Sequence, residues 1–245
     1  MKTPHRLRVG FAALAAIHDA LHEASLPSAA RTARYANHLG SADAAAATLI
    51  GAERMRSWGQ SGPSRFADQV EAHIDAVVGL ERLLGTAQWV QVVHGDFWDN
   101  NVLFADDRIV AILDFDFMAE RARIDDLALT IYFYLLEPGH GRPGRAEWEL
   151  VRSLVDAYDD QTTRPLALEE RLALPLAMAR QPAWSVGRWI VELDEPDAML
   201  HAAQAATEFG VAQQILAELS LWQDSLIRVT LTGTTAGADR ATECQ

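Results

Sequence analysis

The sequence contains almost no cysteine and almost no lysine. Cys244 is the only cysteine in the 245 residues, and Lys2 is the only lysine among the 21 basic residues. One cysteine can form neither a disulfide framework nor a cysteine metal site, which fits a reducing compartment. The lack of lysine excludes lysine-based chemistry at every position after residue 2.

The sequence also lacks an excess of positive charge and a membrane-length apolar run. The formal net charge is −13, and the acidic residues are spread along the chain, which argues against binding to a phosphate backbone. The apolar residues 9–17 are followed at once by His18, Asp19 and His22, with no cleavage site of small residues. We therefore expect a cytoplasmic protein that binds neither nucleic acid nor a membrane.

Helical periodicity is what the sequence has in abundance. Apolar residues make up 49% of the chain and recur at spacings of three and four. The spacing predicts helices over about 10–24, 41–58, 64–85, 124–136, 146–158, 167–193 and 198–226. Ser64 is the expected N-cap of the third helix, and Pro175 and Pro182 should kink or split the sixth. No repeat or long linker interrupts residues 1–228, which we expect to form one domain, followed by a disordered tail over 229–245.

The period changes between residues 89 and 113. Residues 89–93 and 108–113 are short β-branched runs, residues 101–104 lie between them, and residues 105–107 form a turn signal that joins the last two. The predicted fold class is therefore α+β, mostly α, with a small patch of β-hairpin inside a helical protein.

Two acidic clusters lie at the ends of these strands. The first contains His94, Asp96 and Asn101, and the second contains Asp114 and Asp116. A hairpin-like arrangement would bring them together, and converging carboxylate and amide oxygens suit Mg²⁺. A further carboxylate beside the metal could accept a proton from an attacking hydroxyl. The spacing matches the layout of a phosphoryl-transfer loop and its metal-binding aspartate.

The strings HGDFWDNNVLF (residues 94–104) and ILDFD (residues 112–116) resemble the signature of the aminoglycoside phosphotransferase and choline kinase superfamily. The variant with an aromatic residue after HGD is similar to that of bacterial homoserine kinases. The resemblance implies the C-terminal lobe of a protein-kinase-like fold. It also implies an enzyme that uses ATP and Mg²⁺ to phosphorylate a small-molecule hydroxyl.

The resemblance also assigns roles to individual residues. It makes Asp96 the catalytic base and Asn101 and Asp114 the Mg²⁺ ligands. His94 is then a structural residue that braces the loop, and Asp126 supports the backbone of the catalytic loop.

Other polar residues nearby have two interpretations each. Asp116 either adds to the metal site or does not, and Trp98 and Asp99 either contact substrate or only shape the loop. Asp125, the neighbour of Asp126, could instead be an ordinary carboxylate at a helix N-terminus, where the helix dipole favours negative charge. A polar turn between edge strands is the alternative for the whole cluster, but it does not explain why His94, Asp96, Asn101 and Asp114 fall in register.

The resemblance further implies a smaller nucleotide-clamping lobe with a lysine, and no such segment precedes position 94. We therefore expect the chain to correspond to the C-terminal lobe, with the N-terminal lobe removed by truncation or truly absent. Two functional hypotheses follow. The chain is a small-molecule kinase or derives from one, or it is a stand-alone, non-catalytic binding or regulatory module.

The sequence leaves the acceptor open among an aminoglycoside, homoserine, choline or another alcohol, and it does not indicate the oligomeric state. Candidate acceptor-binding residues are Glu120, Asp125, Trp184, Trp189, Glu192 and Asp194. Acidic and tryptophan side chains would suit a cationic amine or amino alcohol, and they are explained equally well as surface acid and core tryptophan.

Overall fold

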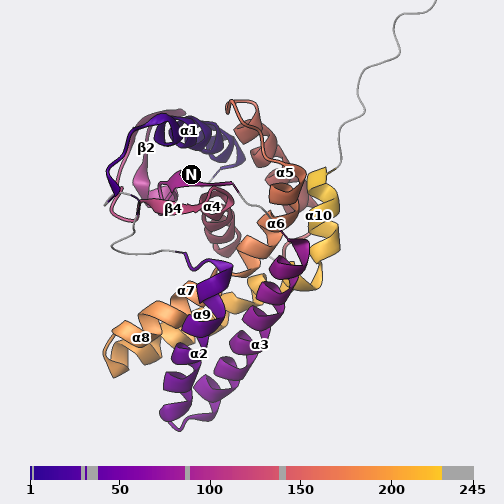
Figure 1. Cartoon of the computed structure of the whole chain (residues 1–245). Coiled ribbons are helices and arrows are strands. Elements are labelled where there is room, and N and C mark those ends of the chain that lie inside the picture. The colour runs from indigo at the N-terminus through magenta and orange to yellow at the C-terminus, as the bar shows by residue number, and fades with distance from the viewer. Residues whose placement is uncertain (2, 29–30, 32–37, 86–88, 138–141, 228–245) are drawn as a thin grey trace, which may run out of the picture.

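Long helices make up most of the structure, a computed structural model that describes residues 1, 3–28, 31, 38–85, 89–137 and 142–227 (Figure 1). The helices are α1 (Pro4–Glu23), α2 (Ser41–Ser57), α3 (Ser61–Leu84), α4 (Ile124–Leu136), α5 (Arg145–Asp159), α6 (Leu168–Ala179), α9 (Glu195–Ala217) and α10 (Leu219–Ile227). Between α6 and α9 lie the short α7 (Pro182–Trp184), the π-helical turn η3 (Ser185–Trp189) and the short α8 (Ile190–Glu192). The predicted tail over 229–245 lies outside the described residues.

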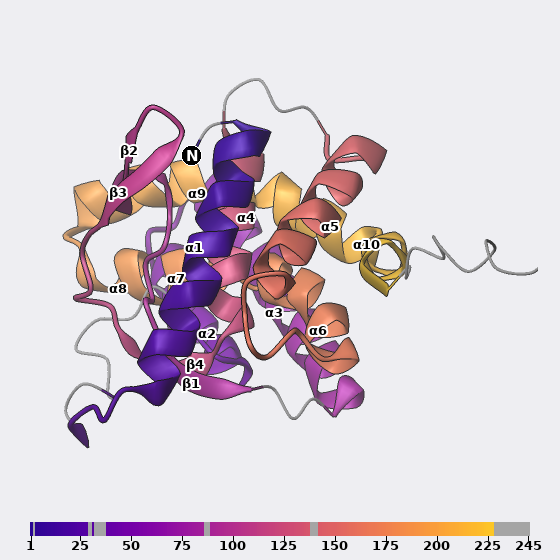
Figure 2. The ribbon, with the colours of Figure 1, turned by 90° about the horizontal axis from the view of Figure 1, so that it is seen from above.

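Helix α4 is the centre of the fold. Its sequence is almost wholly apolar, and residues 124–132 are all buried. Helix α1 packs along α5 and reaches the start of α4 through the contact of His18 with Asp126, while α6 packs against α4 (Figure 2). A helix that is apolar on every face requires such a covering.

The strands form two separate antiparallel pairs. Strand β1 (Val90–Val93) pairs with β4 (Ala119–Ala122), and β2 (Val102–Ala105) pairs with β3 (Arg108–Ile112). The predicted hairpin is confirmed as β2 and β3, whereas β1 lies in a separate pair with β4, a strand that the sequence does not predict. The reason is that Ala119–Ala122 reads AERA, which has little intrinsic preference for strand.

Several predicted helix boundaries also change. Helix α1 begins at Pro4 rather than near residue 10, with the Thr3 side chain accepting a hydrogen bond from the Arg6 N–H. Proline is suited to this first position because its missing N–H has no partner there in any helix. Gln60, not Ser64, is the N-cap of α3.

The two prolines in the predicted helix over 167–193 behave differently. Pro175 lies inside α6 without ending it, whereas Pro182 begins α7 and so marks the split that the sequence predicts. None of the helices in the described ranges is both long enough and apolar enough to cross a membrane.

Candidate active site

The loop that follows β1 is held by His94. The ring Nε2–H donates to the Leu113 carbonyl oxygen at 2.9 Å, and Nδ1 accepts the Asp96 backbone N–H at 3.2 Å. These two bonds require the neutral ring with its proton on Nε2. Burial lowers the pKa of His94, against the opposing effect of the Asp126 charge, so the neutral form is the stable one.

Asp126, in the first turn of α4, supports the backbone of the same loop. Its carboxylate accepts the N–H groups of His94 and Gly95, both at 2.9 Å, and lies 3.1 Å from Nε2 of His18. Burial by itself raises the pKa of Asp126, but the hydrogen bond from His18 and the nearby ring of His38 hold it well below its ordinary value. The loop therefore rests on a buried negative charge.

Gly95 allows this loop to touch the segment that follows Asp116. Its φ is +82°, and a Cβ at this position would lie only 2.1 Å from the Phe117 carbonyl oxygen. No other residue avoids both the left-handed backbone penalty and this clash.

Asn101 orients the Asp96 side chain. The Asn101 amide nitrogen donates to the Asp96 carbonyl oxygen and to the carboxylate Oδ2, each at 2.8 Å. Both residues are buried. Because the Asn101 nitrogen is committed to Asp96, its amide oxygen is left for another partner.

Asp114 is positioned by its neighbour Leu113, which is hydrogen-bonded to Asn101 and His94. The Leu113 N–H donates to the Asn101 carbonyl oxygen at 2.8 Å, and its carbonyl accepts from His94. Asp114 follows with a φ of +61°, unusual for a residue other than glycine, and its side chain is exposed. The Asp116 N–H lies 3.4 Å from Asp114 Oδ1.

The donor atoms gathered here fit a magnesium ion. The Asn101 amide oxygen and the Asp114 carboxylate are hard oxygen ligands. Within the described part of the chain, no group of three or more histidine, cysteine, aspartate or glutamate residues could hold a metal on its own. Magnesium commonly completes its coordination with water and substrate phosphates, so two protein ligands are enough.

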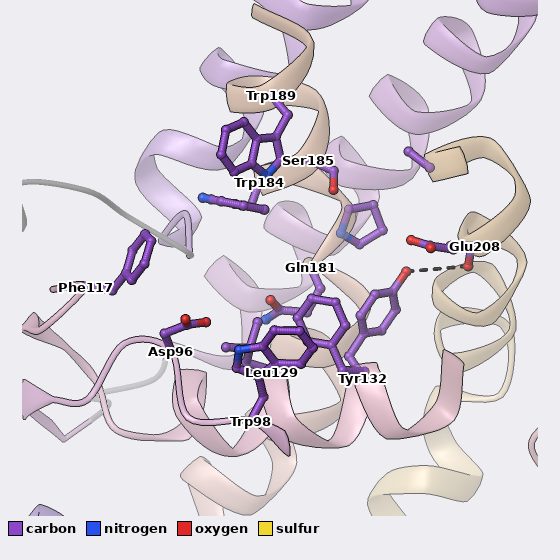
Figure 3. A pocket seen from close by; sticks show the side chains of 13 residues that line it. Asp96, Trp98, Phe117, Leu129, Tyr132, Gln181, Trp184, Ser185, Trp189 and Glu208 are labelled. Carbon is purple, nitrogen blue, oxygen red and sulfur yellow. Dashed lines mark hydrogen bonds between the residues drawn. The ribbon is translucent and has the colours of Figure 1, made fainter. Parts of the chain in front are cut away.

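A cavity of about 240 Å³ opens beside Asp96 (Figure 3). Its lining comes mainly from the loop that follows β1, α4, the segment from α7 to η3, and α9. The lining residues are Asp96, Trp98, Phe117, Leu129, Tyr132, Phe133, Gln181, Pro182, Trp184, Ser185, Trp189, Ala205 and Glu208. The cavity is therefore largely aromatic, with the carboxylates of Asp96 and Glu208 on opposite sides.

The residues suggested by sequence divide between this cavity and other places. Trp184, Trp189 and Trp98 line it, whereas Asp99 does not and instead forms an ion pair with the amino group of Met1. The remaining acceptor candidates have other partners: Glu120 pairs with Arg31, Asp125 with Arg180, Glu192 with Arg188, and Asp194 caps α9.

Sequence reasoning missed Glu208, Tyr132 and Phe117 as lining residues. Glu208 lies in a helix whose polar positions resemble an ordinary solvated face, so no local signal separates it from its neighbours. Tyr132 lies in an apolar run where an aromatic residue is most simply explained as core.

Comparison with known proteins places these features in a family. The family model described as "Phosphotransferase enzyme family" matches residues 3–167. Homoserine kinase of Methylocella silvestris is 27% identical over 202 residues, which cover 78% of this chain and 61% of that protein. Homoserine kinase of Methylobacillus glycogenes is 26% identical over 70% of this chain and 56% of its own length. The chain thus spans about three fifths of the length of these curated relatives.

Solved structures share the fold at low sequence identity. An aminoglycoside phosphotransferase from Alicyclobacillus acidocaldarius superposes with a TM-score of 0.59 at 15% identity, covering 91% of this chain and 68% of that one. A choline kinase from Cryptosporidium parvum gives 0.57 at 14% identity, with 91% and 69% covered. The expected kinase-like, mostly helical fold is confirmed, and the chain belongs to the phosphotransferase enzyme family.

Proposed function

We propose that the chain transfers a phosphoryl group from ATP to the hydroxyl of a small molecule, with Asp96 as the catalytic base. The observation that carries the proposal is the Asp96 carboxylate, which lines the cavity while Asn101 holds it from behind. The curated relatives, named as homoserine kinases, support an alcohol as acceptor.

Asp96 accepts the proton of the acceptor hydroxyl. As that proton leaves, the hydroxyl oxygen forms a bond to the γ-phosphorus, and the bond from this phosphorus to the bridging oxygen of ADP breaks. Asn101 fixes the rotation of the carboxylate, and His94 fixes the Asp96 backbone by accepting its N–H. Both contacts reduce the reorganisation that the base would otherwise need.

Asn101 and Asp114 hold Mg²⁺ in this proposal, and Asp116 is a further candidate ligand. When bound to the nucleotide phosphates, the ion neutralises charge on the transferring group. The positive φ of Asp114 supports this role, because a strained residue of this kind costs roughly 1–3 kcal/mol and is concentrated at functional sites.

Replacing Asp96 tests the proposal. Asp96→Asn keeps an oxygen that can accept from Asn101 but removes the base, so we expect kcat to fall by about 10²–10⁴-fold while the circular dichroism spectrum is unchanged. The assay measures ADP release from Mg·ATP with a panel of small alcohols. Asp75→Asn, an exposed aspartate on α3, is the matched control and should keep wild-type turnover.

Two results would decide against the proposed activity. Equal turnover in wild type and Asp96→Asn would remove Asp96 from the role of base. An intact wild-type chain that binds an alcohol but phosphorylates none would instead favour the non-catalytic binding module.

A further inference from the structure

We infer that the cavity beside Asp96 takes an alcohol that carries an ammonium group and no carboxylate, and that Glu208, Trp184 and Trp189 form its ammonium subsite. The inference deepens the proposed function, since it rests on that function for the reaction of the hydroxyl. It names a substrate class that differs from homoserine, which carries a carboxylate.

The charge of the cavity is the first argument. Two of the lining residues are acidic, Asp96 and Glu208. No lysine, arginine or histidine is among the lining residues that the structure describes. The Glu208 Oε1 accepts a hydrogen bond from Gln204 at 2.9 Å, and no basic side chain in the described ranges forms an ion pair with Glu208. A cationic ligand would supply the missing partner.

The nearest candidate for a compensating charge is His201, on the same helix as Glu208. Burial lowers the pKa of His201, and the Glu208 charge opposes this without reversing it. His201 therefore remains neutral at pH 7, and its ring packs against Trp189 at a centroid distance of 6.2 Å. It does not neutralise the Glu208 carboxylate.

Two tryptophans are brought together beside the cavity by the π-helical turn. In an α-helix, residues five apart lie on different faces. The Ile190 N–H instead donates to the Ser185 carbonyl, five residues earlier, and this wider turn lets Trp184 and Trp189 meet edge to face at 5.3 Å. Aromatic faces gathered near a carboxylate are the usual surroundings of a bound ammonium group.

Tyr132 ties this subsite to the catalytic loop. Its hydroxyl lies 3.5 Å from the Glu208 backbone carbonyl, which joins α4 to α9 (Figure 3). Helix α4 also carries Asp126, which holds the loop before Asp96. Helix α4 therefore contacts both the loop that carries Asp96 and the backbone of Glu208.

The size and charge of the cavity argue against two alternatives. At about 240 Å³ it is smaller than the roughly 300–1,000 Å³ typical of sites for drug-sized ligands, so only part of a multi-ring aminoglycoside would lie inside it. Homoserine fits by size, but its carboxylate would lie between Asp96 and Glu208 with no cation from the lining residues described. An unpaired carboxylate in such surroundings is strongly disfavoured.

Binding of three matched probes to the full chain tests the inference. Choline carries the cation, 3,3-dimethylbutan-1-ol is its neutral carbon counterpart, and homoserine adds the carboxylate. We expect choline to quench tryptophan fluorescence and to bind about tenfold or more tightly than either of the other two. No nucleotide is needed, so the measurement is independent of phosphoryl transfer.

Glu208→Gln is the variant that isolates the charge. It keeps an oxygen to accept from Gln204, so we expect an unchanged fold, about tenfold weaker choline binding and unchanged affinity for 3,3-dimethylbutan-1-ol. Glu195→Gln, at the exposed start of the same helix, is the matched control and should bind choline as wild type does.

The outcomes separate the two proposals. Preferential choline binding that depends on Glu208 supports the inference even if no phosphoryl transfer follows. Equal or tighter binding of homoserine or of the neutral alcohol overturns it, even if those compounds are phosphorylated. Absence of choline binding also overturns it.

Discussion

Gly95 is the residue at which the loop that follows β1 comes into contact with the segment that follows Asp116. Any side chain there would meet the Phe117 carbonyl at 2.1 Å while adopting a φ of +82°. We expect Gly95→Ala to lower the free energy of unfolding by about 1–3 kcal/mol. Because Asp96 is the next residue, we also expect a larger fold-change in kcat than in KM. Urea unfolding and steady-state kinetics measure the two effects.

The control for this change is Gly79→Ala in α3. A Cβ at Gly79 meets nothing within 4 Å, and the backbone there is helical. This variant should gain about 0.5–1 kcal/mol, since alanine restricts the unfolded chain. If Gly95→Ala were as stable and as active as Gly79→Ala, the close contact with Phe117 would not constrain the loop.

At the scale of elements, the π-helical turn depends on close packing against α2. A Cβ on Gly51 would lie 2.1 Å from the Val186 carbonyl oxygen, and a Cβ on Gly187 would lie 2.6 Å from the Ala47 Cβ. The two glycines therefore let the two backbones approach, which positions Trp184 and Trp189 over the cavity.

We expect Gly51→Ala to separate these elements. The added methyl group overfills the contact, so the free energy of unfolding should fall by about 1–3 kcal/mol, and the tryptophan emission maximum should shift as Trp184 and Trp189 move. Gly210→Ala, on α9 with open space around its Cβ, is the control. An emission spectrum identical to that of the control would show that the turn does not rely on this contact.

The sequence predicts those elements whose signals are local. Helix α4 matches its predicted bounds because an unbroken apolar run identifies it, and the β2–β3 hairpin follows from β-branched residues around a polar turn. Strand β4 could not be predicted, since residues 119–122 become a strand only through pairing with β1, about thirty positions earlier.

The residues of the candidate site also fall into two groups, those that the sequence identifies and those that it does not. Motif spacing is enough to single out His94, Asp96, Asn101 and Asp114, which share a short stretch of chain. The cavity wall is assembled from helices distant in sequence, and Glu208 enters it through the packing of α9 on α4 and η3. Tertiary contacts of this kind leave no mark in a local pattern.

At the scale of the whole molecule, buried neutral histidines link stability to pH. Burial lowers the pKa of His38, His73, His94 and His201 below the ordinary value of 6.5, although nearby acceptors oppose this at each of them. In the unfolded chain these rings take up protons near pH 6.5, whereas in the folded chain they do so only at lower pH. The unfolded state therefore binds more protons as pH falls below about 6.5.

We accordingly expect the free energy of unfolding, measured by urea titration, to be constant above about pH 7.5 and to fall between pH 6.5 and 5. Asp126 acts in a separate, more acidic window, because its lowered pKa favours folding until the pH falls below its ordinary value of 3.8. His73→Gln keeps a donor for the Ala179 carbonyl, now 2.8 Å from Nε2, but cannot be protonated. It should reduce the slope below pH 6.5 by up to about 1.4 kcal/mol per pH unit, and an unchanged slope would mean that His73 titrates alike in both states.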